Sequence, residues 1–86
     1  MRIDARTNTA RLEAARSSAG RKVELLEDVR HSRADLAAEY HAAYATWHKC
    51  SAILAKRRGE PDELLGGMAW HQRKAARHLK LAGGAQ

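Results

Sequence analysis

Phenylalanine is absent from this 86-residue chain, and cysteine and proline occur only once each. A single cysteine excludes an internal disulfide, which suits a reducing compartment. Cys50 falls on a d position of an apolar seven-residue repeat and is therefore expected to be a small buried apolar residue. No apolar run approaches the length that spans a membrane, and the first residues hold no apolar signal segment. We therefore expect a cytoplasmic protein, and the usage rich in alanine and arginine favours a bacterium or a phage as its source.

Large apolar side chains are also scarce, because much of the apolar composition is alanine. Burying a large apolar side chain contributes about 1.5–3 kcal/mol, and alanine contributes far less. A chain of this length forms a single domain whose core is near the lower limit for independent folding. Such a core is a candidate for support from self-association or from a partner.

Acidic residues are absent after Glu63, although the whole chain carries a net charge of +6. The same C-terminal segment carries the cations Arg73, Lys74, Arg77 and Lys80. A basic segment of this kind favours an anionic partner, such as nucleic acid, an acidic protein surface or an anionic lipid. The alternative is a solvated basic face that only aids solubility.

A seven-residue apolar repeat runs through half of the chain. With Leu12 as an a position, eleven of the thirteen a and d sites up to Leu54 are apolar, and Lys22 and Arg33 are the exceptions. This pattern predicts one long helix or two collinear helices with a continuous apolar stripe. Over residues 36–54 the stripe is broad and aromatic, which is typical of a bundle face.

A helix boundary is predicted at Gly59. Glycine suits the left-handed residue after a helix end, while Pro61 suits the first turn of the next helix. We therefore predict a turn at 59–60, a second helix over about 61–82 and a frayed tail at 83–86. So short a connection places the two helices side by side and antiparallel, as an αα-hairpin.

Two upstream stretches are weaker signals of a break. Residues 17–20 contain two serines and a glycine, and residues 32–35 match a capping box with aspartate in its last position. Because the repeat keeps its phase through both, we predict a single helix over about 8–58, bent near 17–20, rather than separate helices. The predicted fold class is all-α: a long N-terminal helix and a shorter antiparallel C-terminal helix, paired into a coiled-coil-like or bundle dimer.

In this arrangement the second helix covers only half of the long helix. The uncovered stripe is predicted to form the interface of a homodimer. A different protein, or folding back of the chain at Gly20, would also cover it. The predicted interface residues are Leu12, Ala15, Ala19, Leu26 and Val29.

The polar side of the second helix is the strongest candidate for a binding site. An indole and four cations share this side, and a second basic cluster precedes the turn: Trp70, Arg73, Lys74, Arg77 and Lys80, then Lys56, Arg57 and Arg58. The cations would neutralise phosphates, and the indole would stack on a base or a sugar. Alternatively, Trp70 packs on another subunit with arginine stems over its ring. The apolar side of this helix is predicted to comprise Leu64, Leu65, Met68, Ala75, Ala76 and Leu79.

Five histidines and one cysteine raise the question of a metal site. His41 and His48 are seven residues apart, as are His71 and His78, and seven residues span about 10.5 Å along a helix. That separation is too large for two ligands of one ion. We therefore expect surface histidines, no metal and no cofactor. No catalytic pattern is present, so an enzyme is not expected.

Two functions remain as interpretations. In the first, a non-enzymatic dimer binds nucleic acid through the basic second helix, with little sequence preference. In the second, a small adaptor or inhibitor, of phage or bacterial origin, docks on a larger protein or nucleoprotein machine. A membrane-surface role ranks below both, because the hairpin needs the apolar side of that helix. No small-molecule substrate is expected.

Overall fold

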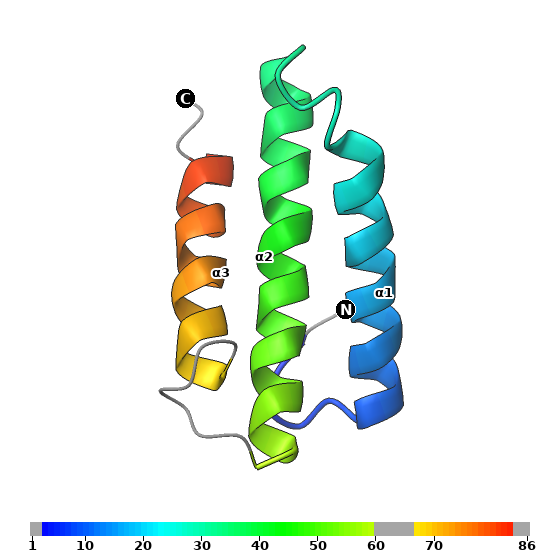
Figure 1. Cartoon of the computed structure of the whole chain (residues 1–86), viewed down its shortest axis with the longest axis vertical. Coiled ribbons are helices and arrows are strands. Elements are labelled where there is room, and N and C mark those ends of the chain that lie inside the picture. Colours follow the sequence, from blue (N-terminus) through cyan, green and yellow to red (C-terminus); the bar gives the residue numbers. More distant parts are fainter. Residues whose placement is uncertain (1–2, 60–66, 84–86) are drawn as a thin grey trace.

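The computed structural model describes residues 3–59 and 67–83, which form three α-helices (Figure 1). Helix α1 spans Thr9–Leu26, α2 spans Ala34–Arg57 and α3 spans Met68–Gly83. The described residues contain no strand, and the predicted all-α class is confirmed. The start of the predicted second helix, and most of the predicted tail, lie outside the described residues.

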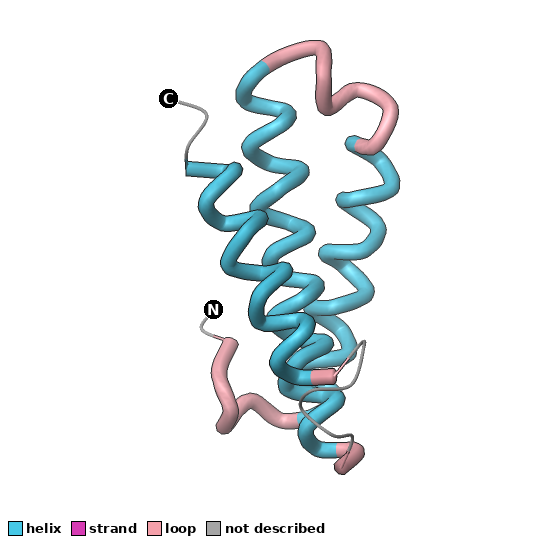
Figure 2. The backbone as a smooth tube through the Cα atoms, turned by 60° about the vertical axis from the view of Figure 1, so that its left-hand side comes forward, coloured by secondary structure: helices cyan, strands magenta, loops and turns pink. Residues whose placement is uncertain are grey.

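The single helix predicted over residues 8–58 is wrong, because the chain turns back after α1 (Figure 2). Residues 27–33 connect α1 to α2, and the N–H of Arg30 donates to the carbonyl of Leu26 at 2.9 Å. This connection is one heptad long, so the phase of the repeat continues across it although the helix does not. Residues 17–20, the other expected weak point, lie within α1.

Local signals explain where the first two helices begin and end. Asn8 caps α1, because its side chain accepts a hydrogen bond from the N–H of Arg11 at 2.8 Å. Helix α2 begins after Arg33, which pairs with Asp35 in the first turn, where a carboxylate also suits the helix dipole. Gly59 has a φ of +77°, which confirms the predicted left-handed residue after α2.

Helix α2 lies between the other two helices and is antiparallel to both (Figure 1). Helices α1 and α3 have no Cα atoms within 8 Å of each other. Each outer helix therefore packs mainly against α2. None of the helices in the described part of the chain is long and apolar enough to cross a membrane.

The core between α1 and α2 is small. Leu12 and Cys50 are fully buried, and Leu54 is 6% exposed beside them. Ile3, from the segment before α1, packs against the same cluster. The buried position predicted for Cys50 is confirmed.

Residues of the predicted dimer interface pack inside the chain instead. Leu12 is 0% and Ala19 is 7% exposed, because α1 folds back on α2 and covers the stripe that a second copy was expected to cover. Ala15 packs against the core, and Leu26 is half-buried at the end of α1. Val29 lies in the connection and is 40% exposed. The reason for predicting a dimer through this stripe is therefore removed.

Candidate functional site

Three exposed cations lie on the side of α3 that faces away from α2; we call Arg73, Arg77 and Lys80 the basic face. Their spacing of four and then three residues places them on neighbouring turns, with Cβ atoms about 5–6 Å apart. The described part of α3 holds no acidic residue, and none of the three cations pairs with a carboxylate of the described residues. The basic face can therefore bind an anionic partner without breaking an ion pair among the described residues.

Trp70 departs from its predicted place among these cations. It is half-buried, and its ring centroid lies 5.6 Å from that of His48 and 4.8 Å from that of His71. The Lys74 ammonium lies over the indole, 5.5 Å from the ring centroid. The indole thus packs against its own chain and carries a cation on its face, so it does not extend the basic face as a stacking platform.

Arg57, the middle residue of the second predicted basic cluster at the end of α2, forms hydrogen bonds within the chain. The guanidinium of Arg57 donates to the hydroxyl of Thr9 at 3.1 Å and to the backbone carbonyl of Thr7. These bonds tie the segment before α1 to the end of α2. Lys56 and Arg58 are exposed beside Arg57. Binding of phosphate by Arg57 would therefore compete with its hydrogen bonds to the N-terminal segment.

Four histidines meet between α2 and α3, and we call His41, His48, His71 and His78 the histidine seam. The Nδ1 atoms of His41 and His78 are 2.9 Å apart. Those of His48 and His71 are 2.8 Å apart. In each pair one Nδ1–H donates to the other Nδ1, so the two neutral rings are opposite tautomers. The prediction of surface histidines is wrong for His48, which is 4% exposed, and for His71, which is 8% exposed.

Tyr44 contacts one ring of each histidine pair, and those two rings, of His48 and His78, also stack on each other with centroids 5.7 Å apart. Its ring stacks on His48, with centroids 4.9 Å apart, and on His78, with centroids 4.5 Å apart. Trp47 lies close to edge-on against His71, with centroids 5.6 Å apart. In the described part of the chain, helix α3 is therefore held on α2 largely by a row of contacting rings, with Ala75 also buried.

The inward side of α3 differs from the predicted apolar side. Leu79, which was predicted to pack inward, is 60% exposed, and Ala76 is exposed as well. Ala75 is buried as predicted, at 8% exposure. The prediction favoured aliphatic residues and treated histidine as polar, whereas a neutral, hydrogen-bonded imidazole packs as an aromatic ring.

Burial lowers the pKa of three imidazoles in the seam. For His48, desolvation is the largest cause and the charges of neighbouring side chains add to it, so its pKa falls from 6.5 to about 4. The pKa values of His41 and His78 are also lowered, mainly by desolvation. These shifts favour the neutral form of the three rings, with which the hydrogen bond of each pair is compatible.

The described part of the chain gives little support to metal binding or to catalysis by a nucleophilic thiol. No group of three or more His, Cys, Asp and Glu side chains there is placed to hold a metal ion. Cys50 is fully buried, and desolvation raises the pKa of its thiol. A buried neutral thiol is a poor nucleophile.

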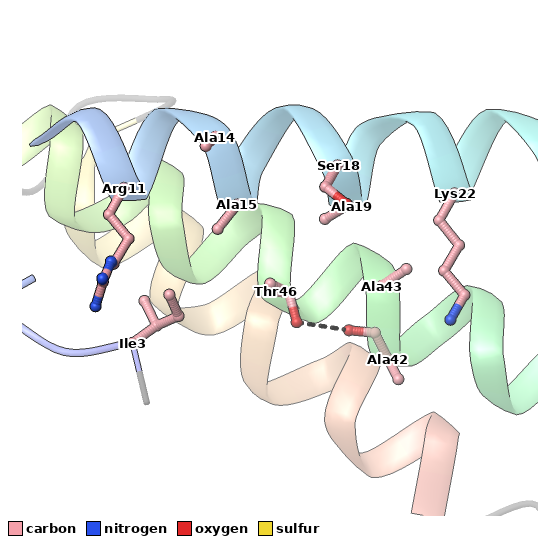
Figure 3. Close-up of a pocket in the computed structure, with 10 residues that line it drawn as sticks. All are labelled: Ile3, Arg11, Ala14, Ala15, Ser18, Ala19, Lys22, Ala42, Ala43 and Thr46. Atoms are coloured by element: carbon pink, nitrogen blue, oxygen red, sulfur yellow. Dashed lines mark hydrogen bonds between the residues drawn. The ribbon is translucent and has the colours of Figure 1, made fainter. Parts of the chain in front are cut away.

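A groove runs between α1 and α2, and no residue of α3 lines it (Figure 3). It has a volume of about 560 Å³ and is lined by small side chains, among them Ala14, Ala15 and Ala42. Arg11 lies toward one end and Lys22 toward the other. We call this feature the alanine groove. Sequence reasoning missed it, because it exists only when α1 folds back on α2.

The histidine seam did have a signal in the sequence. Both helices carry two histidines seven residues apart, so an antiparallel register that joins His41 to His78 also joins His48 to His71.

Comparisons of the chain with protein-family models, with curated proteins and with solved structures give no match.

Proposed function

We propose that the protein binds nucleic acid through the basic face of α3 and catalyses no reaction. The observation that carries this proposal is the outward position of Arg73, Arg77 and Lys80 on a helix without acidic residues in its described part. Cations on neighbouring turns can follow a phosphate backbone, and each neutralised phosphate releases counterions that favour binding. The net charge of +6 adds long-range attraction.

Contacts of this kind go to phosphates and carry little sequence information. Trp70 does not add base stacking in this geometry, because its ring lies against His48 and His71 under the ammonium of Lys74. The proposed ligand is therefore a nucleic-acid backbone, with little preference among base sequences.

The test is fluorescence anisotropy with labelled duplex DNA, single-stranded DNA and RNA over a series of salt concentrations. Three phosphate contacts predict a slope of log K against log salt of roughly −2 to −3. Arg73→Glu/Arg77→Glu should weaken binding by at least about tenfold. A matched control is Arg6→Glu/Arg21→Glu, which makes the same change in net charge at exposed residues outside α3. No binding of any probe at low salt, or equal losses in both variants, would contradict the proposal.

A second function, an adaptor that docks on another protein, is favoured by the alanine groove. Its small side chains allow a helix to approach closely, and Arg11 and Lys22 stand toward its two ends. The occupant that matches these charges is a helix of a partner protein with small residues on one face and carboxylates beside it.

Affinity purification from the native host would test the adaptor function. Ala42→Glu, at an exposed residue of the groove, should abolish recovery of the partner, whereas Arg73→Glu/Arg77→Glu should retain it. The opposite pattern would assign the partner to the basic face. Sedimentation of the purified chain as a dimer that Ala42→Glu dissociates would identify a second copy as the occupant and overturn the adaptor proposal.

A further inference from the structure

Each histidine pair of the seam can accept one proton without losing its hydrogen bond, but it cannot accept two. Each pair is joined by one Nδ1–H···Nδ1 hydrogen bond. One added proton on a pair leaves this bond in place, because an imidazolium can still donate to a neutral ring. A second proton places two N–H donors opposite each other and two positive charges at the same contact, so the pair must separate.

Among the described residues, the charged side chains that act on His41, His48 and His78 offer little compensation for such protons. From α3, Lys74 acts on His48, and Lys74 and Arg77 act on His78. From the connection between α1 and α2, Arg30 acts on His41 and on His78. All of these charges are positive and lower the pKa values of the imidazoles.

Two carboxylates approach the neighbouring tyrosines from the side of α1. Glu24 lines a hollow of about 210 Å³ together with Tyr44, and Glu27 acts on the hydroxyl of Tyr40. Neither is among the groups that shift the pKa values of His41, His48 or His78. Among the described residues, positive charge on His41, His48 and His78 is therefore opposed rather than balanced.

The interface between α1 and α2 lacks this sensitivity. Its core is formed by Leu12, Cys50 and Leu54, with aliphatic residues around it. The fifth histidine, His31, lies exposed in the connection between α1 and α2, outside both interfaces. Acid should therefore act on the contact of α3 with α2 before it acts on the contact of α1 with α2.

We propose that the histidine seam is an acid-sensitive latch, in which protonation of the paired imidazoles releases α3 from α2 while α1 and α2 stay packed. Release would expose more of the half-buried rings of Tyr44 and Trp70, and the side of the Trp47 ring that contacts His71. It would also change the position of the basic face relative to the rest of the chain. The latch is independent of whether the basic face binds nucleic acid, because it concerns only the contact between the two helices.

Hydrogen exchange of the wild-type chain tests the latch directly. Amide protection factors, corrected for the intrinsic effect of pH, are compared between about pH 7 and about pH 4, a range that runs from above the ordinary pKa of histidine down to that of His48 in the folded chain. The expected result is a loss of protection in α3 that exceeds the loss in α1 by at least about tenfold. Equal losses in α1 and α3, or full protection of α3 at the acidic end, would overturn the proposal.

Variants then assign the effect to the seam. Asparagine places an amide donor and acceptor near the position of Nδ1 and does not titrate, so His48→Asn/His71→Asn should make the protection of α3 less dependent on pH. His41→Asn/His78→Asn tests the other pair, and His31→Asn is the control, which should behave as the wild type. If both double variants keep the full pH dependence of the wild type, the latch proposal fails. If one double variant already loses α3 protection at neutral pH, the proposal is judged by the pH dependence of the other double variant and of the wild type.

Discussion

The indole of Trp47 lies against the backbone of Gly20, and 3.4 Å would separate its Cδ1 atom from a Cβ at residue 20. The guanidinium of Arg16, one turn earlier on α1, lies over the same indole at 4.5 Å from the ring centroid. Arg16 also donates to the hydroxyl of Ser51 at 2.7 Å. Helix α1 therefore contacts this ring of α2 with a bare backbone at one point and a cation at the next.

Gly20→Ala is expected to raise the free energy of unfolding by about 0.5–1 kcal/mol, because alanine is favoured over glycine inside a helix. A Cβ at 3.4 Å from the indole makes an ordinary van der Waals contact, so the added methyl should be accommodated. Gly59→Ala is the contrasting variant, since its φ of +77° is strained for alanine and should cost about 1 kcal/mol. Urea titrations measure both. A destabilised Gly20→Ala chain would mean that the indole cannot shift.

Leu12→Ala is expected to lower the free energy of unfolding by about 2–5 kcal/mol, as large-to-small substitutions in a core do. Leu12 is 0% exposed against α2 of its own chain, so the loss should not depend on protein concentration. Leu25→Ala is the control, because Leu25 is 78% exposed and its loss should stay within about 0.5 kcal/mol. A stability of Leu12→Ala that rises with protein concentration would point back to a dimer through this stripe.

The free energy of unfolding should fall as the pH is lowered through the range in which the seam titrates. The pKa of His48 is about 4 in the folded chain against a model-peptide value of 6.5. Below 6.5 the unfolded chain binds a proton that the folded chain does not, so stability is full above that pH and is lost as the pH falls toward 4. The maximum loss from this group is about 3 kcal/mol. Urea midpoints followed by tryptophan fluorescence measure it, and a midpoint independent of pH would contradict it.

Cys50 should react slowly with thiol reagents in the folded chain. Its side chain is fully buried, and burial raises the pKa of its thiol, so both access and thiolate population are reduced. The rate of labelling by iodoacetamide should rise with urea in parallel with the unfolded fraction. The denatured chain at the same pH is the control. Labelling of the native chain at the rate of the denatured chain would show that α1 does not cover this residue.

Much of the local structure could be predicted from the sequence, because helix signals are short-range. Gly59 was identified as the stop of α2, and Cys50 as a buried residue, from their own positions and neighbours. The break between α1 and α2 could not be found in the same way. A seven-residue connection keeps the heptad phase, so the argument from phase fails for this length of loop.

The functional residues were predictable only where exposure follows from charge. Arg73, Arg77 and Lys80 were placed on the outer side of α3, and the structure leaves all three exposed. His48 and His71 were wrongly predicted to lie on the surface, because an imidazole changes from a polar surface group to a packing ring when a second imidazole meets it across an interface. That meeting depends on the register of α2 against α3, which no single helix specifies.

The position of α2 between two helices that do not approach each other has a consequence for how the chain responds to substitutions. The stability of such an arrangement is a sum of helix terms and two nearest-neighbour interfaces, as in a short repeat array. Substitutions at Leu12 and at His78 should therefore be additive to within about 0.3–0.5 kcal/mol. Trp47 is the expected exception, since its ring touches Gly20 on one side and His71 on the other and so couples the two interfaces energetically.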